Sequence, residues 1–297
     1  MTISSFLDPK VLARIDNLEL LAKTVVDGFI NGLHRSPYLG LSIDFAEHRP
    51  YMPGDDIRRI DWRVFGRTDR FYVKQFEADT NANFVVILDI SRSMDYASQG
   101  ITKLDYARYL AACLSYFSRQ QRDRVGLITI ADDLVDFVPP SAKHLEVVLH
   151  TIDRVKPAAQ GNLSGPLLKV AEATKRRSIL ALISDLYDEP ESVVRSANVL
   201  KNKGNDVIVF QILDPAELNF PFDEAAHFVD LESGERIPVV PEQQREQYQE
   251  LMNGHLAELS RLLIESQIDY YLFETSQPLD HALFRYLSRR ERSSRVR

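Results

Sequence analysis

The sequence predicts an α/β fold in which a mostly parallel β-sheet is flanked by helices. From about residue 83 onward, short apolar runs alternate with segments whose apolar residues recur at helical spacing, which is typical of parallel strands joined by helices. The first run, from Phe84 to Leu88, is apolar throughout, as expected for a central strand buried on both faces. A chain of 297 residues, 44% hydrophobic and 27% charged, can bury a substantial core.

Residues 1–80 are predicted to form an N-terminal extension that contains helix and a small β subdomain. Apolar positions in its first half follow helical spacing, and strand-like runs occur at residues 39–45 and 71–73. We expect the α/β domain to occupy residues 81–290, and a basic tail to occupy residues 291–297.

Strands and helices are predicted to alternate through the rest of the chain. An antiparallel hairpin is expected to turn at Asp132 and Asp133, because strand-like runs flank this pair. Ser164 is expected to cap the helix that follows it, since a serine hydroxyl can accept a hydrogen bond from the first helical turn. The predicted strands cover residues 84–88, 125–131, 134–138, 178–185, 206–213 and 270–273, with a hairpin over 228–240, and the predicted helices cover residues 103–121, 145–155, 166–175, 192–203, 243–266 and 279–287.

Composition argues against several classes of protein. A net charge of −7 and a pI near 5.6 do not favour broad nucleic-acid binding. Arginines from Arg58 to Arg70 could form a local patch for nucleic acid, but aspartates from Asp55 to Asp69 nearly balance them, so we interpret the segment as internally paired. The single cysteine, Cys113, excludes an intrachain disulfide, and histidines without a His-x-x-x-His pair argue against zinc.

The sequence also bears on location. No uninterrupted apolar stretch approaches the roughly 20 residues that span a bilayer. The N-terminus lacks the basic segment and apolar core of a signal peptide. We therefore expect a cytoplasmic protein without an integral membrane segment.

Polar side chains gather where two of the predicted strands end. Asp89, Ser91 and Ser93 follow the first strand directly, and Asp185 ends a later one. A glycine-bearing loop, residues 161–165, is expected at the same edge because it opens a helix that leads into the Asp185 strand. Carboxylate and hydroxyl oxygens are hard ligands suited to magnesium. The sequence therefore predicts that these groups converge on a magnesium site.

These motifs resemble the metal-ion-dependent adhesion site of von Willebrand factor A-type domains. The resemblance rests on the run Asp89-Ile-Ser-Arg-Ser93, the glycine-bearing loop and the strand end Ile183-Ser-Asp185. An upstream block, from Gly40 to Arg63, reads GLSIDFAEHRPYMPGDDIRRIDWR and resembles the block that marks domain-of-unknown-function family 58 (DUF58), bacterial proteins built on that domain. The resemblance covers roughly residues 35 to 190.

The resemblance implies a Rossmann-like von Willebrand A fold and assigns the ligands. Asp89, Ser91 and Ser93 would form the first metal loop, and Asp185 would act through water in the third. The second loop departs from the pattern, because Asn162 stands where a threonine is usual, with Ser164 two positions on. An amide oxygen can also ligate magnesium.

The resemblance further implies a non-enzymatic protein-interaction module. A partner protein's carboxylate would complete the coordination shell of the magnesium. The partner would be a MoxR-type AAA+ ATPase or its client, in the assembly or maturation of other proteins. Residues 215–240 have no role in this interpretation.

Two alternatives remain open from the sequence, and a third is disfavoured. The hydroxyls after Asp89 could merely cap local backbone, as serines often do. A magnesium-dependent phosphoryl hydrolase could use Asp89 as nucleophile, but Ser91 occupies the position of its general acid and no lysine is obviously placed to hold a phosphoryl group. A serine hydrolase lacks its Gly-x-Ser-x-Gly elbow.

Overall fold

The computed structural model describes most of the chain as two compact units. One unit consists of residues 1–27 and 81–297, and the other of residues 28–80. The domain boundaries expected at residues 80 and 290 stay predictions. The described residues are 8–35, 47–51, 62–75, 82–158, 163–231 and 234–286.

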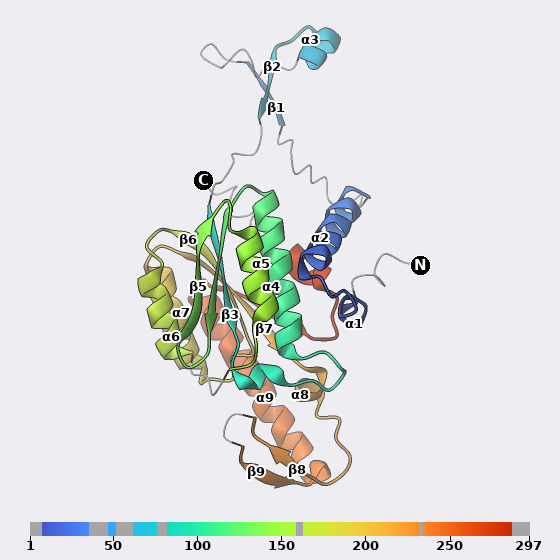
Figure 1. Ribbon diagram of the computed structural model, residues 1–297, viewed down its shortest axis with the longest axis vertical. Helices are drawn as coiled ribbons and strands as arrows, with labels where there is room; N and C mark the ends of the chain where they lie inside the picture. The colour runs from blue at the N-terminus through green and yellow to red at the C-terminus, as the bar shows by residue number, and fades with distance from the viewer. Residues whose placement is uncertain are drawn as a thin grey trace. The chain divides into compact units, whose positions relative to one another are not determined.

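A six-stranded sheet forms the centre of the larger unit (Figure 1). Its strand order is β10-β7-β6-β3-β4-β5, and all neighbours are parallel except the edge strand β5, which runs antiparallel to β4. The predicted α/β class with a mostly parallel sheet is confirmed. The strands are β3 (Asn83–Asp89), β4 (Arg124–Ile130), β5 (Leu134–Ser141), β6 (Ser178–Ser184), β7 (Asp206–Leu213) and β10 (Asp269–Glu274).

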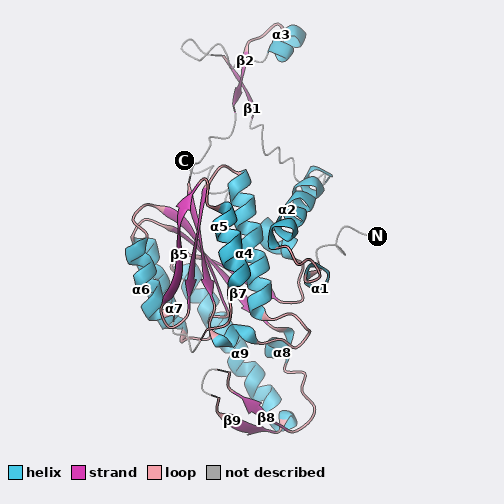
Figure 2. Cartoon of the chain, in the orientation of Figure 1, coloured by secondary structure: helices cyan, strands magenta, loops and turns pink. Residues whose placement is uncertain are grey.

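Helices cover both faces of this sheet (Figure 2). Helices α4 and α5 pack together over one face, and α6, α7 and α9 pack over the other. The central strand β3 is buried along its whole length, which explains its continuous apolar sequence. The helices are α1 (Pro9–Leu12), α2 (Leu18–Arg35), α4 (Lys103–Gln120), α5 (Leu145–Arg154), α6 (Ser164–Ala173), α7 (Pro190–Asn202), α8 (Pro215–Asn219) and α9 (Pro241–Glu265), and residues 279–286 are also helical.

Two local predictions have different outcomes. The antiparallel hairpin of β4 and β5 is confirmed, with its turn at Asp132 and Asp133. The capping role of Ser164 is wrong, because α6 begins at Ser164 itself, with Leu163 as its N-cap and no side-chain cap. The Ser164 hydroxyl lies 2.7 Å from that of Ser192 on α7, so helix packing engages it instead.

A second hairpin follows β7 in the larger unit. Strands β8 (Ala226–Val229) and β9 (Arg236–Val239) pair antiparallel, which confirms the predicted hairpin. In Figure 1 this hairpin lies beyond the edge of the sheet at which β3 ends, beside the start of α9. Two strands alone are marginally stable in water, so the contacts of Phe228 with the rings of Phe220 and Phe222, which follow α8, help to hold the hairpin.

The smaller unit contains a short β-ladder and a helix. Strands β1 (Glu47–Pro50) and β2 (Tyr72–Gln75) pair antiparallel, and α3 (Trp62–Thr68) lies between them in sequence. The rings of Phe65 and Phe71 stack with centroids 4.5 Å apart. The strand expected at residues 39–45, and the ion pairs expected around residues 52–61, lie outside the described residues.

No helix within the described ranges is both long and apolar enough to cross a membrane.

Candidate metal-binding site

The register of two central strands brings the predicted carboxylates together. Strands β3 and β6 are parallel neighbours, and Leu88 lies opposite Ile183. One step along, Asp89 therefore lies beside Ser184, whose hydroxyl donates a 2.6 Å hydrogen bond to the Asp89 carboxylate. Asp185 follows at the same edge, so the structure brings Asp89 and Asp185 together, and both line one cavity.

The loop after β3 places two hydroxyls beside Asp89. The carboxylate of Asp89 accepts a 2.9 Å hydrogen bond from the Ser91 N–H, which fixes the start of the loop. The hydroxyl oxygens of Ser91 and Ser93 lie 3.0 Å apart. Two oxygens that occupy adjacent corners of a magnesium octahedron are separated by about 3.0 Å, given bonds of about 2.1 Å.

Asp89 is a buried carboxylate whose charge is not compensated by a paired cation among the described residues. Its side-chain hydrogen bonds come from two neutral donors, Ser91 and Ser184. Burial, with a further contribution from the nearby charge of Asp185, raises the pKa of Asp89 to about 6. A cation bound beside this group would oppose both effects.

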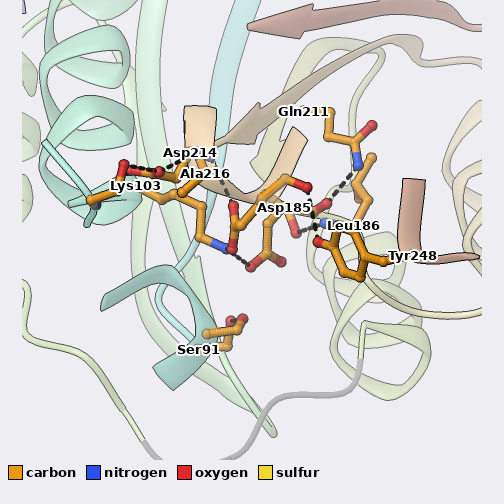
Figure 3. A network of polar contacts seen from close by, with 12 residues as sticks. Ser91, Lys103, Asp185, Leu186, Gln211, Asp214, Ala216 and Tyr248 are labelled. Atoms are coloured by element: carbon orange, nitrogen blue, oxygen red, sulfur yellow. Dashed lines mark hydrogen bonds and ion pairs between the residues drawn. The ribbon is translucent and has the colours of Figure 1, made fainter. Parts of the chain in front are cut away.

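Asp185, in contrast, already has a cation. The Nζ of Lys103 lies 2.8 Å from the Asp185 carboxylate and 2.6 Å from that of Glu217 (Figure 3). The Lys103 side chain is 1% exposed. Burial alone would lower the pKa of Lys103, but the two carboxylates outweigh it and raise the pKa. Lys103 is therefore held as a buried ammonium at the first residue of α4.

Two contacts fix the partners of Lys103 in place. Glu217 completes a capping box at the start of α8 by accepting a 2.8 Å hydrogen bond from the Asp214 N–H. The Gln211 amide donates a 2.7 Å hydrogen bond to the Asp185 carbonyl, as Figure 3 shows. The ring of Tyr187 lies beneath the ammonium, with its centroid 4.7 Å from Nζ.

A cavity of about 640 Å³ opens on these groups. Four predicted site residues, Asp89, Ser91, Ser93 and Asp185, line it together with Lys103. Its remaining walls come largely from α8 and the β8–β9 hairpin, which belong to the segment to which the sequence assigned no role, and from α9. Asn162, predicted for the second metal loop, lies outside the described residues.

Sequence reasoning missed Lys103, Ser184 and Glu217. One local signal was available, because Asp-Pro-Ala-Glu from Asp214 to Glu217 has the spacing of a capping box. The contacts of Lys103 had no such signal, since they join residues 82 and 114 positions apart in the chain.

The donor set suits a hard cation and little else. Within the described ranges, no three or more His, Cys, Asp or Glu side chains are grouped so as to hold a metal ion. The candidate ligands are instead one carboxylate and two hydroxyls, all oxygen donors, and these fit magnesium that keeps part of its water shell. The residues described at this edge therefore fit the predicted metal.

Lys103 bears on one argument against a phosphoryl hydrolase. The sequence showed no lysine obviously placed for a phosphoryl group, yet Lys103 lines the same cavity as Asp89. Its ammonium is nevertheless bound by two carboxylates. The second argument is unchanged, because Ser91 cannot supply the proton of a general acid.

Comparisons with known proteins give a family and a fold. The family model described as "Protein of unknown function DUF58" matches residues 47–258. Uncharacterized protein Rv1480 of Mycobacterium tuberculosis (strain ATCC 25618 / H37Rv) is 30% identical over 233 residues, which cover 76% of this chain and 73% of the relative.

Two solved structures share the fold at low identity. Conserved hypothetical protein BatB from Bacteroides thetaiotaomicron is 19% identical with a TM-score of 0.50, over 70% of this chain and 98% of that one. An aerotolerance-related membrane protein from Bacteroides fragilis is 18% identical with a TM-score of 0.50, over 70% and 99% of the two chains.

Replacing Lys103 with methionine is expected to destabilise the protein strongly. The substitution keeps the length of the side chain but leaves Asp185 and Glu217 as buried carboxylates without their cation. Removing one partner of such a buried pair costs about 3–5 kcal/mol. The free energy of unfolding in urea measures this loss.

Lys169→Met is the matched control. The Lys169 ammonium also lies 2.6 Å from a carboxylate, that of Asp133, but both side chains are more than half exposed. Solvent screens such a pair, so the midpoint of unfolding should hardly move. Equal losses in the two variants would mean that the burial of the Lys103 network contributes nothing.

Asp89→Asn is expected to stabilise the metal-free protein at neutral pH. The pKa of Asp89 is raised to about 6 in the folded state, from an ordinary 3.8. Protonated Asp89 therefore contributes favourably to the free energy of unfolding below pH 3.8, and this contribution is lost as the pH rises through 6. With EDTA at pH 7.5, the variant should be more stable by about 1–3 kcal/mol. Urea unfolding at several pH values should show this gap closing towards pH 4; a gap that does not change with pH would contradict the shift.

Proposed function

Because the chain belongs to the DUF58 family and has a von Willebrand A-type fold, we propose that it is a non-enzymatic protein-interaction module. In this proposal, magnesium bound at the edge of the sheet captures a carboxylate of a partner protein. The observation that carries the proposal is Asp89, a buried carboxylate without a paired cation, beside two hydroxyl oxygens at octahedral spacing.

Each residue has a separate part in this proposal. Asp89 supplies the negative charge, and the Ser91 and Ser93 hydroxyls supply neutral oxygens. Asn162 would contribute from the second loop. Asp185, which is already neutralised by Lys103, would contact the metal's water rather than the metal itself. When bound, magnesium supplies a positive charge that attracts an external carboxylate.

The balance of charge supports capture of an anion. Because Asp185 is paired with Lys103, Asp89 would be the one carboxylate that directly faces the dication, so the metal and its ligands would keep a positive charge. Lys103, Asp185 and Glu217 together carry a charge of −1 behind them. A site with three or four carboxylates would cancel the charge of the metal and leave no electrostatic attraction for a partner's carboxylate. The sparse ligand set is thus suited to recognition.

Magnesium is expected to bind the wild-type protein saturably, and this binding should be lost in Asp89→Asn. Calorimetric titration at pH 7.5 measures it, with Asp132→Asn as the control because Asp132 is an exposed carboxylate at the same edge of the sheet. The absence of magnesium binding in the wild type would remove the basis of the proposal.

The hydrolase alternative is tested with the same preparations. Magnesium-dependent hydrolysis of a generic phosphate ester that disappears in Asp89→Ala would favour the enzyme. We expect no hydrolysis that depends on Asp89.

The partner is proposed to be a MoxR-type AAA+ ATPase or its client. Support for this identity comes from the resemblance of the motifs alone. We expect that tagged protein captures a MoxR-type ATPase from its source cells in magnesium, and that EDTA or Asp89→Asn abolishes the capture. Mass spectrometry identifies the captured chain; equal capture with and without magnesium would contradict the metal-dependent mode.

A further inference from the structure

The cavity above the candidate metal site has two chemically different ends. One end carries Asp89 and the hydroxyls of the first loop. The other is lined by aromatic and aliphatic side chains from the segment after β7. This apolar wall consists of Phe220, Phe222, Phe228, Ile237, Val239 and Tyr248.

The apolar wall is a built structure. Phe220 packs against Tyr248 with ring centroids 4.7 Å apart, and Phe222 packs edge-on against Phe228 at 4.9 Å. Two hydrogen bonds tie the segment to α9: the Tyr248 hydroxyl donates to the Glu217 carbonyl at 2.8 Å, and Arg245 donates to the Phe222 carbonyl at 2.7 Å. The wall is therefore formed before any ligand arrives.

Backbone strain occurs at one residue that lines the cavity, Phe220, and at Leu186, which follows the lining residue Asp185. Phe220 ends α8 in the left-handed region, with φ 46° and ψ 59°, and Leu186, which follows Asp185, has φ 55°. Bulky residues seldom adopt this conformation, which costs about 1–2 kcal/mol per residue. Strain of this kind is concentrated at binding sites, where the surrounding structure holds it.

Part of the wall is exposed although it lies on the apolar face of the hairpin. Ile237 is paired across the hairpin with Phe228, so both side chains project from the same face. Phe228 packs into the ring cluster, whereas Ile237 is 52% exposed. The apolar face thus continues past the packed rings into open cavity.

We infer that this wall binds a bulky apolar side chain next to the partner's acidic residue, so that the partner presents a short acidic–aromatic motif. The inference rests on the proposed function and specifies its ligand. A carboxylate matches the metal end in charge, and an aromatic side chain matches the ring-lined end. A cavity of about 640 Å³ has room for both groups, since cavities of about 300–1,000 Å³ enclose drug-sized ligands.

Blocked peptides test the inference. The probes are N-acetyl-Gly-Glu-Phe-Gly-amide and the same peptide with Ala in place of Phe. A second pair has the reverse order, with Phe or Ala before Glu. NMR titration of the wild-type protein in saturating magnesium measures the dissociation constants. In at least one order, the Phe peptide is expected to bind about tenfold or more tightly than its Ala counterpart, because the ring leaves water.

Ile237→Ser is the diagnostic variant. The Ile237 side chain is half exposed, so the substitution should leave the core intact. It should reduce the preference for Phe severalfold and leave the affinity of the Ala peptide unchanged. Leu251→Ser is the control, because Leu251 is 67% exposed on α9 and is not part of the cavity wall. It should retain the full preference.

The outcomes separate this inference from the proposed function. Equal affinities for Phe and Ala peptides in both orders, with binding that needs magnesium, would overturn the acidic–aromatic motif and leave carboxylate capture standing. A preference for Phe that Ile237→Ser does not change would also overturn the assignment to this wall. Failure of every peptide to bind in magnesium would overturn both.

Discussion

Two carboxylates at the ends of neighbouring parallel strands are costly to bury unless each charge is compensated. Lys103 compensates one of them, because its ammonium is bound between Asp185 and Glu217. Asp89 is left with neutral donors and an uncompensated charge, which is why its pKa rises. The edge of the sheet thus holds one carboxylate that is paired with a buried ammonium and one that favours either a proton or a cation.

The same lysine connects the sheet edge to the segment after β7. Asp185 directly follows β6, Lys103 begins α4 and Glu217 lies on α8, so one ammonium joins three parts of the chain. Asp214 adds a second tie, because it caps α8 and also accepts hydrogen bonds from the backbone N–H and the hydroxyl of Ser98. The apolar wall is therefore held in a fixed place relative to the metal loops.

Local pattern predicted the strands and the convergence of Asp89, Ser91, Ser93 and Asp185, because each of these residues ends or follows a buried run. It did not predict Lys103, whose charge is paired through contacts between distant parts of the chain. The rings of the apolar wall are indistinguishable in sequence from ordinary core residues, since their packing gives no sign that one face lines a cavity. Ser164 was misassigned because a cap and a first helical residue have similar sequence signals.

Dividing the cavity between two parts of the chain separates affinity from specificity. In the proposed function, the loops after β3 and β6 would determine whether a cation binds, and through it whether any carboxylate is attracted. The rings of the α8–β9 segment would not contact the bound cation. This segment would therefore discriminate among partners by the side chain next to their carboxylate. Apolar contacts discriminate modestly, by roughly 1–3 kcal/mol for one group. A module built this way would select a class of acidic motif, and wider contacts of the complex would have to select the individual partner.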